Sequence, residues 1–346
     1  MKKKLVRGAG LVTRPHVHYL LAVPGLEVTV ASRTVSKAET LVEGHPNGRA
    51  VALDVGDEAA LEALIREHDL SVSMLPYAYH PLVAALCVKH RKHMVTTSYV
   101  KDAMLALDGP AKEAGVILLN EIGVDPGIDH MAAMKIIHDV DRRGGTIESF
   151  VSWVGGLPAP EASDNPFGYK FSWSPKGVLL AGKNPARFRK DGQIVETPGE
   201  ELFDHYWPVH INGLGEFEGY PNRDSMPYTE TYSIQPRDAM FRGTLRIVGW
   251  CATLEKMVGM GLMDDVPLDP PPATYRELTA QLLDVSPDTD FPQYLAGQWG
   301  MCDDSKPITD MAWLGLFADD PVPEGKTTAV DIMAAQMEAK MAYKPG

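Results

Sequence analysis

Three carboxylates fall within eleven residues of this chain, in the segment Asn120-Glu121-Ile122-Gly123-Val124-Asp125-Pro126-Gly127-Ile128-Asp129-His130. A positioned carboxylate can accept a proton or orient a substrate. One of Asp125 and Asp129 is a candidate N-cap for the helix that follows. Three acids exceed what a cap requires, so we predict a functional site in this segment. His130, taken alone, is more typical of a structural role.

A glycine turn lies near the start of the chain, at Gly8-Ala9-Gly10-Leu11-Val12-Thr13. Small residues let the backbone approach a pyrophosphate, and the helix that follows supplies N–H groups and a positive dipole end. Thr13 replaces the third glycine of the GxGxxG pattern, so an ordinary glycine turn is the alternative. Arg7 precedes the turn where a side chain should face a buried sheet, so it needs a partner or a route to solvent.

The residues after the second predicted strand, Ser32-Arg33-Thr34, bear on which dinucleotide binds. An acid here would hold the ribose hydroxyls of NAD and repel a 2′-phosphate, whereas arginine and two hydroxyls attract that phosphate. The sequence therefore favours NADP and NADPH over NAD; the alternative is a solvated arginine on a loop. Asp54-Val55, after the third strand, is a further candidate at the cofactor's edge.

Two later strand ends and two arginines complete the candidate chemistry. Leu75-Pro76-Tyr77 and Thr97-Ser98-Tyr99 end the fourth and fifth predicted strands, where a nicotinamide would lie. Arg223 and Arg246 are each able to bind a carboxylate through two hydrogen bonds. The alternative for both arginines is a structural ion pair.

Short apolar runs alternate with amphipathic stretches over roughly the first 120 residues, which predicts an α/β fold with a parallel sheet covered on both faces. The ligand site of such a sheet lies beyond the carboxyl ends of its strands. The predicted strands are 4–6, 28–31, 50–53, 70–75, 93–96 and 116–119.

The pattern changes after Asp129. Alternating polar and apolar residues predict antiparallel-type strands, and long Gly/Pro/aromatic loops between them are typical of site-building segments. The predicted strands are 146–154, 229–234 and 244–248, the loops are 155–176 and 213–228, and the helices are 130–142, 275–284 and 329–341.

Length and composition exclude several classes of protein. The 346 residues are enough for about two domains. A hydrophobic content of 45% and a mean hydropathy of -0.14 are typical of a globular chain, and no apolar run is long enough for a membrane span. A net charge of -13 argues against nucleic-acid binding. Three scattered cysteines exclude a disulfide framework and a CxxC metal site, so we expect a cytoplasmic enzyme without a bound metal.

Several of these motifs together resemble the NADP-dependent, L-glutamate-forming saccharopine dehydrogenases, also called saccharopine reductases. The most specific are NEIGVDPGIDH, GGLPAPE and YPNRDS. The resemblance runs over nearly the whole chain. It is carried by residues 8–15, 75–77, 96–100, 120–130, 155–161, 168–173, 220–225, 242–246 and 313–317.

The resemblance implies a variant Rossmann domain, an α/β saccharopine-binding and dimerisation domain, and a small all-helical insertion. We assign these to residues 1–127, to 128–262 with 308–346, and to 263–307. It also implies reversible oxidation of saccharopine by NADP. The resulting imine is hydrolysed to L-glutamate and 2-aminoadipate 6-semialdehyde, a reaction of lysine metabolism.

Site residues follow from the resemblance position by position. Asp125 is expected to accept or orient a proton and Tyr99 to hold substrate, both as catalytic residues. The cofactor is expected at Gly8, Gly10, Leu11, Val12, Thr13, Ser32, Arg33, Thr34, Asp54, Val55, Leu75, Pro76, Asp125 and Trp173. Saccharopine is expected at Ser98, Tyr99, Asp125, Arg223, Thr244, Leu245 and Arg246. Its three carboxylates suit the two arginines.

This sequence departs from the family at two places. Trp153-Val154-Gly155-Gly156 stands where the family has Tyr-Cys-Gly-Gly, so no catalytic thiol is expected there. Family members also continue past the point that matches Lys344-Pro345-Gly346, with a segment that completes both sheets. Exposed sheet edges and apolar faces would then favour a homodimer or lower stability. The alternatives are a related imine-forming amino-acid or polyamine reductase and a truncated, non-catalytic cofactor-binding scaffold.

Overall fold

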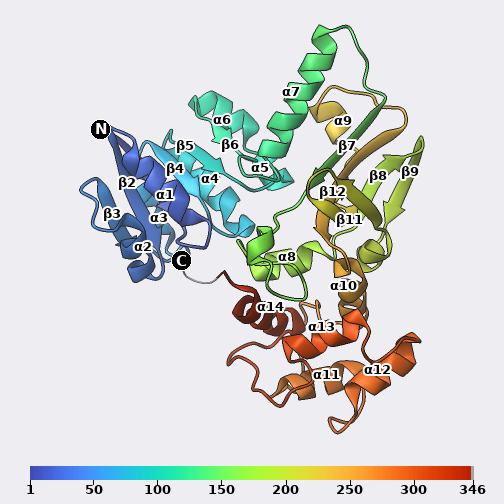
Figure 1. Cartoon of the computed structure of the whole chain (residues 1–346). Helices are drawn as coiled ribbons and strands as arrows, with labels where there is room; N and C mark the ends of the chain where they lie inside the picture. The colour runs from blue at the N-terminus through green and yellow to red at the C-terminus, as the bar shows by residue number, and fades with distance from the viewer. Residues whose placement is uncertain (344–346) are drawn as a thin grey trace. The chain divides into compact units, whose positions relative to one another are not determined.

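The computed structural model describes residues 1–343, so the prediction placed on Lys344, Pro345 and Gly346 lies outside the described residues. The chain divides into two compact units, Met1–Ile136 and Ile137–Gly346, and the boundary falls within helix α7 (Ile128–Arg142). Figure 1 shows the elements of the first unit in blue to green and those of the second in green to red. The division into three domains stays a prediction.

The first unit contains a six-stranded sheet in which every pair of neighbouring strands is parallel. This confirms the predicted α/β fold. The strand order is β3-β2-β1-β4-β5-β6. Strands β2 and β3 lie on one side of β1, and β4, β5 and β6 lie on the other, so the order of the strands changes direction between β1 and β4. Ligands of such sheets bind at this switch point, outside the carboxyl ends of the strands. The strands are β1 (Lys2–Arg7), β2 (Leu26–Ser32), β3 (Gly48–Ala52), β4 (Leu70–Ser73), β5 (His93–Thr96) and β6 (Leu118–Leu119).

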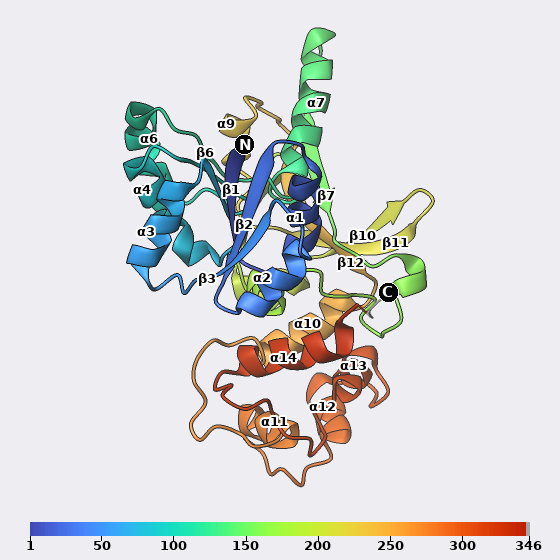
Figure 2. The same ribbon diagram turned by 90° about the vertical axis from the view of Figure 1, so that its left-hand side faces the viewer.

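Helices cover both faces of this sheet because neighbouring residues of a strand point to opposite sides. Leu5 packs with side chains of α3, α4 and α5, while Val6 packs with those of α1 and α2. Figure 2 shows α3 and α4 on one side of the sheet and α1 and α2 on the other. The helical elements are α1 (Thr13–Ala22), α2 (Val35–Val42), α3 (Glu58–Glu67), the 3-10 turn η1 (Tyr77–Tyr79), α4 (His80–Lys89), α5 (Asp102–Leu105) and α6 (Asp108–Ala114).

Helix α3 shows how the local sequence sets these elements. The side chain of Asp57 accepts a hydrogen bond from Ala60 N at 3.0 Å and caps the helix. Glu58 lies in the first turn, where a negative charge suits the helix dipole. Leu61, Leu64 and Ile65 recur at helical spacing, and all three are buried. Helix α3 is thus one of the amphipathic stretches that alternate with the predicted strands.

The second unit contains a mixed sheet of order β10-β11-β12-β8-β9, and β7 pairs with β12 in parallel. The other pairs are antiparallel. The strands are β7 (Ser149–Val154), β8 (Ala186–Lys190), β9 (Gln193–Thr197), β10 (Trp207–Ile211), β11 (Gly215–Pro221) and β12 (Ala239–Ile247).

A cluster of helices packs together in the same unit, and Figure 2 shows α10 to α14 grouped there. Its core joins Leu254 and Met257 of α10 to Met311 of α13 and to Met333 and Met337 of α14, all fully buried or nearly so. None of the helices in residues 1–343 is both long and apolar enough to cross a membrane. The helical elements are η2 (Pro160–Ala162), α8 (Pro175–Ala181), η3 (Gly199–Asp204), α9 (Tyr228–Thr231), α10 (Trp250–Gly259), α11 (Tyr275–Leu283), α12 (Phe291–Trp299), α13 (Lys306–Leu314) and α14 (Ala329–Met341).

Three predictions of secondary structure in this unit were wrong. The segment 146–154 was expected to form an antiparallel-type strand, whereas β7 pairs with β12 in parallel. The strand predicted for 229–234 is instead the short helix α9 followed by a turn. Pro227 precedes α9 with helical dihedral angles, φ -58° and ψ -22°, and so starts a helical turn despite the β-branched residues that follow. Strand β11 lies within the segment 213–228 predicted as a loop.

Candidate active site

The glycine turn occupies the carboxyl end of β1. Gly8 has φ +103°, and a Cβ at this position would lie 2.8 Å from the carbonyl oxygen of Met74, so only glycine fits. Helix α1 begins at Thr13, with no side-chain cap and no acidic residue in its first turn. The hydroxyl of Thr13 is buried and has no hydrogen-bond partner in residues 1–343. A narrow glycine turn before an uncapped helix fits a pyrophosphate.

The segment that ends β2 is consistent with a phosphate group beside it. Ser32 ends the strand, and its Oγ accepts a hydrogen bond from Thr34 N at 3.3 Å. Arg33 is exposed, and no carboxylate of residues 1–343 pairs with it. Asp54 has a local structural role, because its Oδ1 accepts a hydrogen bond from Gly56 N at 2.9 Å in the turn before α3.

A buried histidine connects the carboxyl ends of β4 and β5. His80 is 2% exposed, with Nδ1 3.0 Å from Ser73 Oγ. Its Nε2 lies 2.8 Å from Ser98 Oγ and 3.2 Å from Thr96 Oγ1. Burial lowers the pKa of His80 to about 4, and the positive charge of Arg7 adds to that shift.

The sequence reasoning missed His80. The only signal was its position four residues after Pro76, in the segment that leaves β4 and enters α4. Three of its partners come from the ends of two neighbouring strands and the turn beyond, which a single sequence does not place together.

The structure brings together the two residues predicted to be catalytic. The hydroxyl of Tyr99 donates a hydrogen bond to Oδ1 of Asp125 at 2.5 Å. Tyr99 follows β5, and Asp125 lies in the loop between β6 and α7, before the cis peptide bond to Pro126. An ionised carboxylate that accepts such a bond is held in one orientation. The pair can therefore present a proton acceptor and a hydroxyl group at the same point.

The other two acids of this loop are engaged with the loop itself. Glu121 accepts a hydrogen bond from Val100 N at 2.8 Å through Oε1, and its Oε2 lies 3.0 Å from His130 Nε2. Asp129 accepts a hydrogen bond from Gly127 N at 2.6 Å. The segment with three acids thus divides into two carboxylates that fix the loop and one, on Asp125, that contacts Tyr99.

A small apolar cavity of about 190 Å³ lies beside this pair. Lys101 borders it, with Nζ 3.9 Å from the ring centroid of Tyr77. Its lining residues are Tyr77, Ala78, His80, Pro81, Tyr99, Lys101, Ala103 and Met104. The cavity therefore adjoins both His80 and Tyr99.

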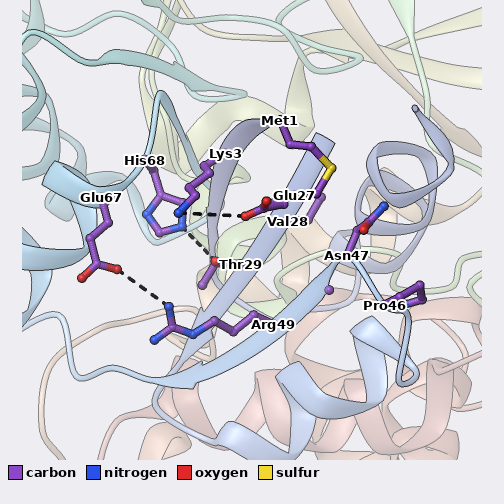
Figure 3. A pocket seen from close by; sticks show the side chains of 11 residues that line it. Met1, Lys3, Glu27, Val28, Thr29, Pro46, Asn47, Arg49, Glu67 and His68 are labelled. Atoms are coloured by element: carbon purple, nitrogen blue, oxygen red, sulfur yellow. Dashed lines mark hydrogen bonds and ion pairs between the residues drawn. The ribbon is translucent and has the colours of Figure 1, made fainter. Parts of the chain in front are cut away.

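Another cavity, of about 180 Å³, lies at the opposite, amino-terminal edge of the same sheet. Figure 3 shows the buried His68 at its wall, with Nε2 2.8 Å from Thr29 Oγ1. Two exposed ion pairs surround it, Lys3 with Glu27 at 4.0 Å and Arg49 with Glu67 at 3.7 Å. These carboxylates and cations neutralise one another, and none belongs to the predicted site.

Arg7 has neither the partner nor the route to solvent that the sequence analysis required. Its side chain is fully buried, and none of its three guanidinium nitrogens has a hydrogen-bond partner in residues 1–343. Burial lowers the pKa of Arg7 to about 10, because a desolvated cation is less stable than a hydrated one. Its charge acts on His80 and Cys87.

In the second unit, Arg246 is held on β12 as a desolvated cation. It is 7% exposed, and its guanidinium carbon lies 4.8 Å from the ring centroid of Tyr169 and 5.3 Å from that of Trp250. Nη1 donates a hydrogen bond to Leu245 O at 2.8 Å, whereas Nε has no partner in the described chain. A buried guanidinium with an unused N–H group is suited to binding a carboxylate.

Thr244 lies on β12, and Arg223 lies just beyond the end of the neighbouring strand β11. Arg223 follows β11 in a left-handed conformation, φ +61°, and its carbonyl oxygen accepts a hydrogen bond from Arg187 N at 3.2 Å. Thr244 and Arg246 point to the same face of β12, since they are two residues apart, and Leu245 points to the other. Thr244 is in register with Val154 of β7, the position at which this sequence departs from the family pattern and lacks a thiol.

Trp173 belongs to the second unit, whereas every other residue predicted to bind cofactor belongs to the first. Its side chain is 43% exposed. It lies close to the start of α8, because a Cβ added to Gly177 would come 2.8 Å from its Cζ3 atom. A role for Trp173 in cofactor binding stays a prediction.

The tryptophan that departs from the family pattern lies flat against the second sheet. A Cβ at Gly219 would come 2.5 Å from Cζ3 of Trp153, and a Cβ at Gly243 would come 2.2 Å from the same atom. The indole also packs edge-on against Phe241, with ring centroids 4.8 Å apart. It occupies space that glycines on β11 and β12 leave open.

Residues 1–343 contain no group of three or more His, Cys, Asp or Glu side chains placed to hold a metal ion.

Two family models cover almost the entire chain. The saccharopine dehydrogenase NADP binding domain matches residues 5–119, and the saccharopine dehydrogenase C-terminal domain matches residues 123–346. The two matches meet at the loop that carries Asp125.

Full-length relatives agree with these models. The chain is 44% identical to saccharopine dehydrogenase [NADP(+), L-glutamate-forming] of Schizosaccharomyces pombe, over 100% of this chain and 79% of that protein. It is 39% identical to the mitochondrial alpha-aminoadipic semialdehyde synthase of Bos taurus, over 100% of this chain and 38% of that protein. The apo saccharopine dehydrogenase (L-Glu forming) structure from Saccharomyces cerevisiae matches with a TM-score of 0.84 and 37% identity, over 99% of this chain and 78% of that one. This chain belongs to the saccharopine dehydrogenase family.

Proposed function

We propose that this protein is an NADP-dependent oxidoreductase of lysine metabolism that converts saccharopine reversibly to L-glutamate and 2-aminoadipate 6-semialdehyde. The observation that carries the proposal is the match over the whole chain to the NADP(+), L-glutamate-forming enzyme of S. pombe at 44% identity. The hydrogen bond between Tyr99 and Asp125 supplies a chemical arrangement that suits this reaction.

The reaction requires one proton acceptor and one hydride acceptor. NADP held at the turn from Gly8 to Thr13 would supply the hydride acceptor for the carbon next to the secondary amine. Asp125 accepts the proton that the amine nitrogen loses, and Tyr99 holds the carboxylate in position by its hydrogen bond. Water then adds across the C=N bond, with its oxygen on the carbon and a proton on the nitrogen. The remaining proton of the new hydroxyl passes to the nitrogen as the C–N bond breaks, which releases L-glutamate and the semialdehyde. The first proton acceptor, Asp125, lies at the carboxyl edge of the first sheet.

The cofactor and the substrate use different residues in this proposal. The turn from Gly8 to Thr13 accepts the pyrophosphate, and Arg33 with Ser32 and Thr34 accepts the 2′-phosphate. The unpaired charge of Arg33 supports this assignment. Arg246 and Arg223 each bind a carboxylate of saccharopine, together with Ser98, Thr244 and Leu245. The unused Nε of Arg246 supports its part.

We also propose a cytoplasmic homodimer. Cys87, Cys251 and Cys302 are all unpaired, as is usual in a reducing compartment. The edge strand β6 carries exposed apolar side chains at Leu119 and next to it at Ile117, which a second copy would cover. Sedimentation at several concentrations measures the oligomeric state, and a monomer at all of them would exclude the dimer.

A steady-state assay tests the activity. Purified protein is mixed with saccharopine and either NADP or NAD at mildly alkaline pH, and formation of the reduced cofactor is followed by absorbance. Turnover with saccharopine and NADP is expected. Turnover only with other amines would identify a related imine-forming reductase instead. Cofactor binding without any turnover would identify a non-catalytic scaffold.

A further inference from the structure

His80 is the centre of a buried chain of hydroxyl groups that leads to the candidate substrate site. Ser73, at the end of β4, lies on its Nδ1 side, and Thr96 and Ser98 lie on its Nε2 side. Ser98 is only half-buried, whereas Ser73, Thr96 and His80 are buried. This series of hydrogen-bonded side chains therefore runs from the interior of the sheet to the hydroxyl of Ser98, which a ligand can reach.

The hydrogen-bond partners assign the proton on the imidazole ring. The single hydroxyl hydrogen of Thr96 is used, because it is donated to Ser73 O at 2.9 Å. Thr96 Oγ1 can then only accept from His80 Nε2, so Nε2 carries the hydrogen. A neutral ring has one N–H group, so Nδ1 is an acceptor and receives the hydroxyl hydrogen of Ser73.

The same assignment fixes the role of Ser98. The one hydrogen of His80 Nε2 is shared between Ser98 Oγ at 2.8 Å and Thr96 Oγ1 at 3.2 Å, and Ser98 is the nearer acceptor. The hydroxyl hydrogen of Ser98 itself is given to no group in residues 1–343. Ser98 is next to Tyr99 in the chain, whose hydroxyl is bound to Asp125. A hydroxyl that has already accepted a hydrogen bond becomes a better donor, because hydrogen bonds in a chain polarise one another.

We propose that His80 is a positioning residue that turns the hydroxyl of Ser98 into a hydrogen-bond donor for a carboxylate of saccharopine. The inference rests on the proposed function and adds a specificity element to the same site. It requires an imidazole that stays neutral. The burial of His80 and the nearby charge of Arg7 both keep it neutral at physiological pH, because they disfavour a second positive charge.

Two substitutions of His80 separate positioning from simple packing. His80→Gln places an amide N–H group at the reach of Nε2, so Ser98 keeps its donor. His80→Asn has the shorter side chain, with its polar atoms at the reach of Nδ1, so Ser98 loses that donor. Ser98→Ala removes the hydroxyl and changes the fold least. The double variant His80→Asn with Ser98→Ala tests whether the two residues act through each other.

The measured quantities are KM and kcat for saccharopine, the Kd of saccharopine and of NADPH by calorimetry, and the melting temperature. Loss of one hydrogen bond to a charged group should raise KM and Kd for saccharopine about tenfold in Ser98→Ala and in His80→Asn. In the double variant, KM and Kd for saccharopine should be no higher than in either single variant. In His80→Gln, both constants should stay within about threefold of the wild-type values. NADPH binding should be unchanged in all four.

His68→Gln is the matched control. His68 is also a buried histidine of the first unit with both ring nitrogens in hydrogen bonds, to Leu64 O at 2.6 Å and Thr29 Oγ1 at 2.8 Å (Figure 3). It lies at the amino-terminal edge of the sheet, so its replacement should lower the melting temperature and leave the saccharopine constants unchanged.

The outcomes separate the two proposals. A wild-type protein that neither binds nor oxidises saccharopine would overturn the proposed function, and this inference with it. A wild-type protein that binds and oxidises saccharopine, with His80→Asn equal to wild type in KM and Kd, would overturn this inference alone. The inference would also be overturned if the fold-increases in KM and Kd caused by His80→Asn and by Ser98→Ala multiplied in the double variant, because the two residues would then act separately.

Discussion

Tyr99 and Asp125 lie 26 positions apart in the sequence, yet the tyrosine hydroxyl donates a 2.5 Å hydrogen bond to the carboxylate. Tyr99 follows β5, and Asp125 lies beyond β6, the next strand of the parallel sheet. Neighbouring parallel strands bring the residues after their carboxyl ends together. The pair is therefore a product of the sheet order, and a reacting amine that meets one of the two groups also meets the other.

Replacement of Asp125 tests its role in proton transfer. Asp125→Asn keeps the shape of the side chain and removes its ability to accept a proton. We expect kcat for saccharopine oxidation to fall about a hundredfold or more, the usual effect of losing a general base. Tyr99→Phe removes only the hydrogen bond that orients the carboxylate and should have a smaller effect. Steady-state kinetics over a pH series measure both, and a wild-type kcat in Asp125→Asn would exclude this base.

Replacement of Arg33 tests the preference for NADP. Arg33→Ala removes the positive charge that we assign to the 2′-phosphate, a group that NAD lacks. NADPH affinity should fall about tenfold or more, since hydrogen bonds to a charged group are lost, while NADH affinity should change little. Fluorescence titration with each cofactor measures the difference. Equal losses for the two cofactors would show that Arg33 does not contact the phosphate.

Replacement of Arg223 tests the assignment of the substrate carboxylates. Arg223→Ala should raise KM for saccharopine at least tenfold, because a bidentate contact to a carboxylate is lost, and should leave NADPH affinity unchanged. Arg237→Ala is the control, since Arg237 is an exposed arginine of the same unit outside the predicted site. Arg223→Ala kinetics equal to those of Arg237→Ala would remove Arg223 from the substrate site.

The buried guanidinium of Arg7 should lower stability. A desolvated charge without a hydrogen-bond partner costs free energy in the folded state alone. Arg7→Met keeps a long side chain and removes the charge, so the free energy of unfolding should rise by about 1–3 kcal/mol. Urea denaturation measures it, with the exposed Arg66→Met as the control. A less stable Arg7→Met protein would show that the charge has a compensating partner.

The pKa of His80 predicts how stability depends on pH. Its ordinary value of 6.5 applies to the unfolded chain, and burial lowers the pKa to about 4 in the folded protein. Between these values the unfolded chain binds a proton that the folded chain does not. The free energy of unfolding should therefore decrease as the pH falls from about 6.5 toward 4, and stay constant above this range for this group.

The measurement is urea denaturation at several pH values. Burial also lowers the pKa of His68, so this residue adds to the loss with the same sign. His80→Gln should reduce the pH dependence without abolishing it. An equally steep dependence in His80→Gln would mean that His80 is protonated in both states.

The sequence was informative where one short segment determines its own structure. The run Val28-Thr29-Val30-Ala31 is apolar enough to predict a buried strand, and β2 contains it. The turn at Gly8 was predictable for the same reason, since glycine itself permits the backbone conformation that the turn requires. The strand predicted for 229–234 was wrong, because the helical conformation of Pro227 outweighed the strand preference of the β-branched residues after it.

The candidate site was predictable only in part, because contacts between distant segments assign the roles. The residues alone identified a segment with three acids without separating their roles, and only the family resemblance assigned the proton to Asp125. Glu121 and Asp129 differ from Asp125 only through partners that the folded loop supplies, such as Val100 N for Glu121. His80 was missed because its partners lie on several strand ends.

The indole of Trp153 restricts the order in which this sheet can change during evolution. Its Cζ3 atom occupies the place of a methyl group at both Gly219 and Gly243. An alanine at either glycine therefore requires a smaller residue at position 153. It also requires a shift of Phe241 beside Gly243, 2.5 Å from the Cβ, or of Val209 beside Gly219, 2.8 Å from the Cβ. Positions on three different strands are thus coupled, and a substitution at one of them changes which substitutions the others tolerate.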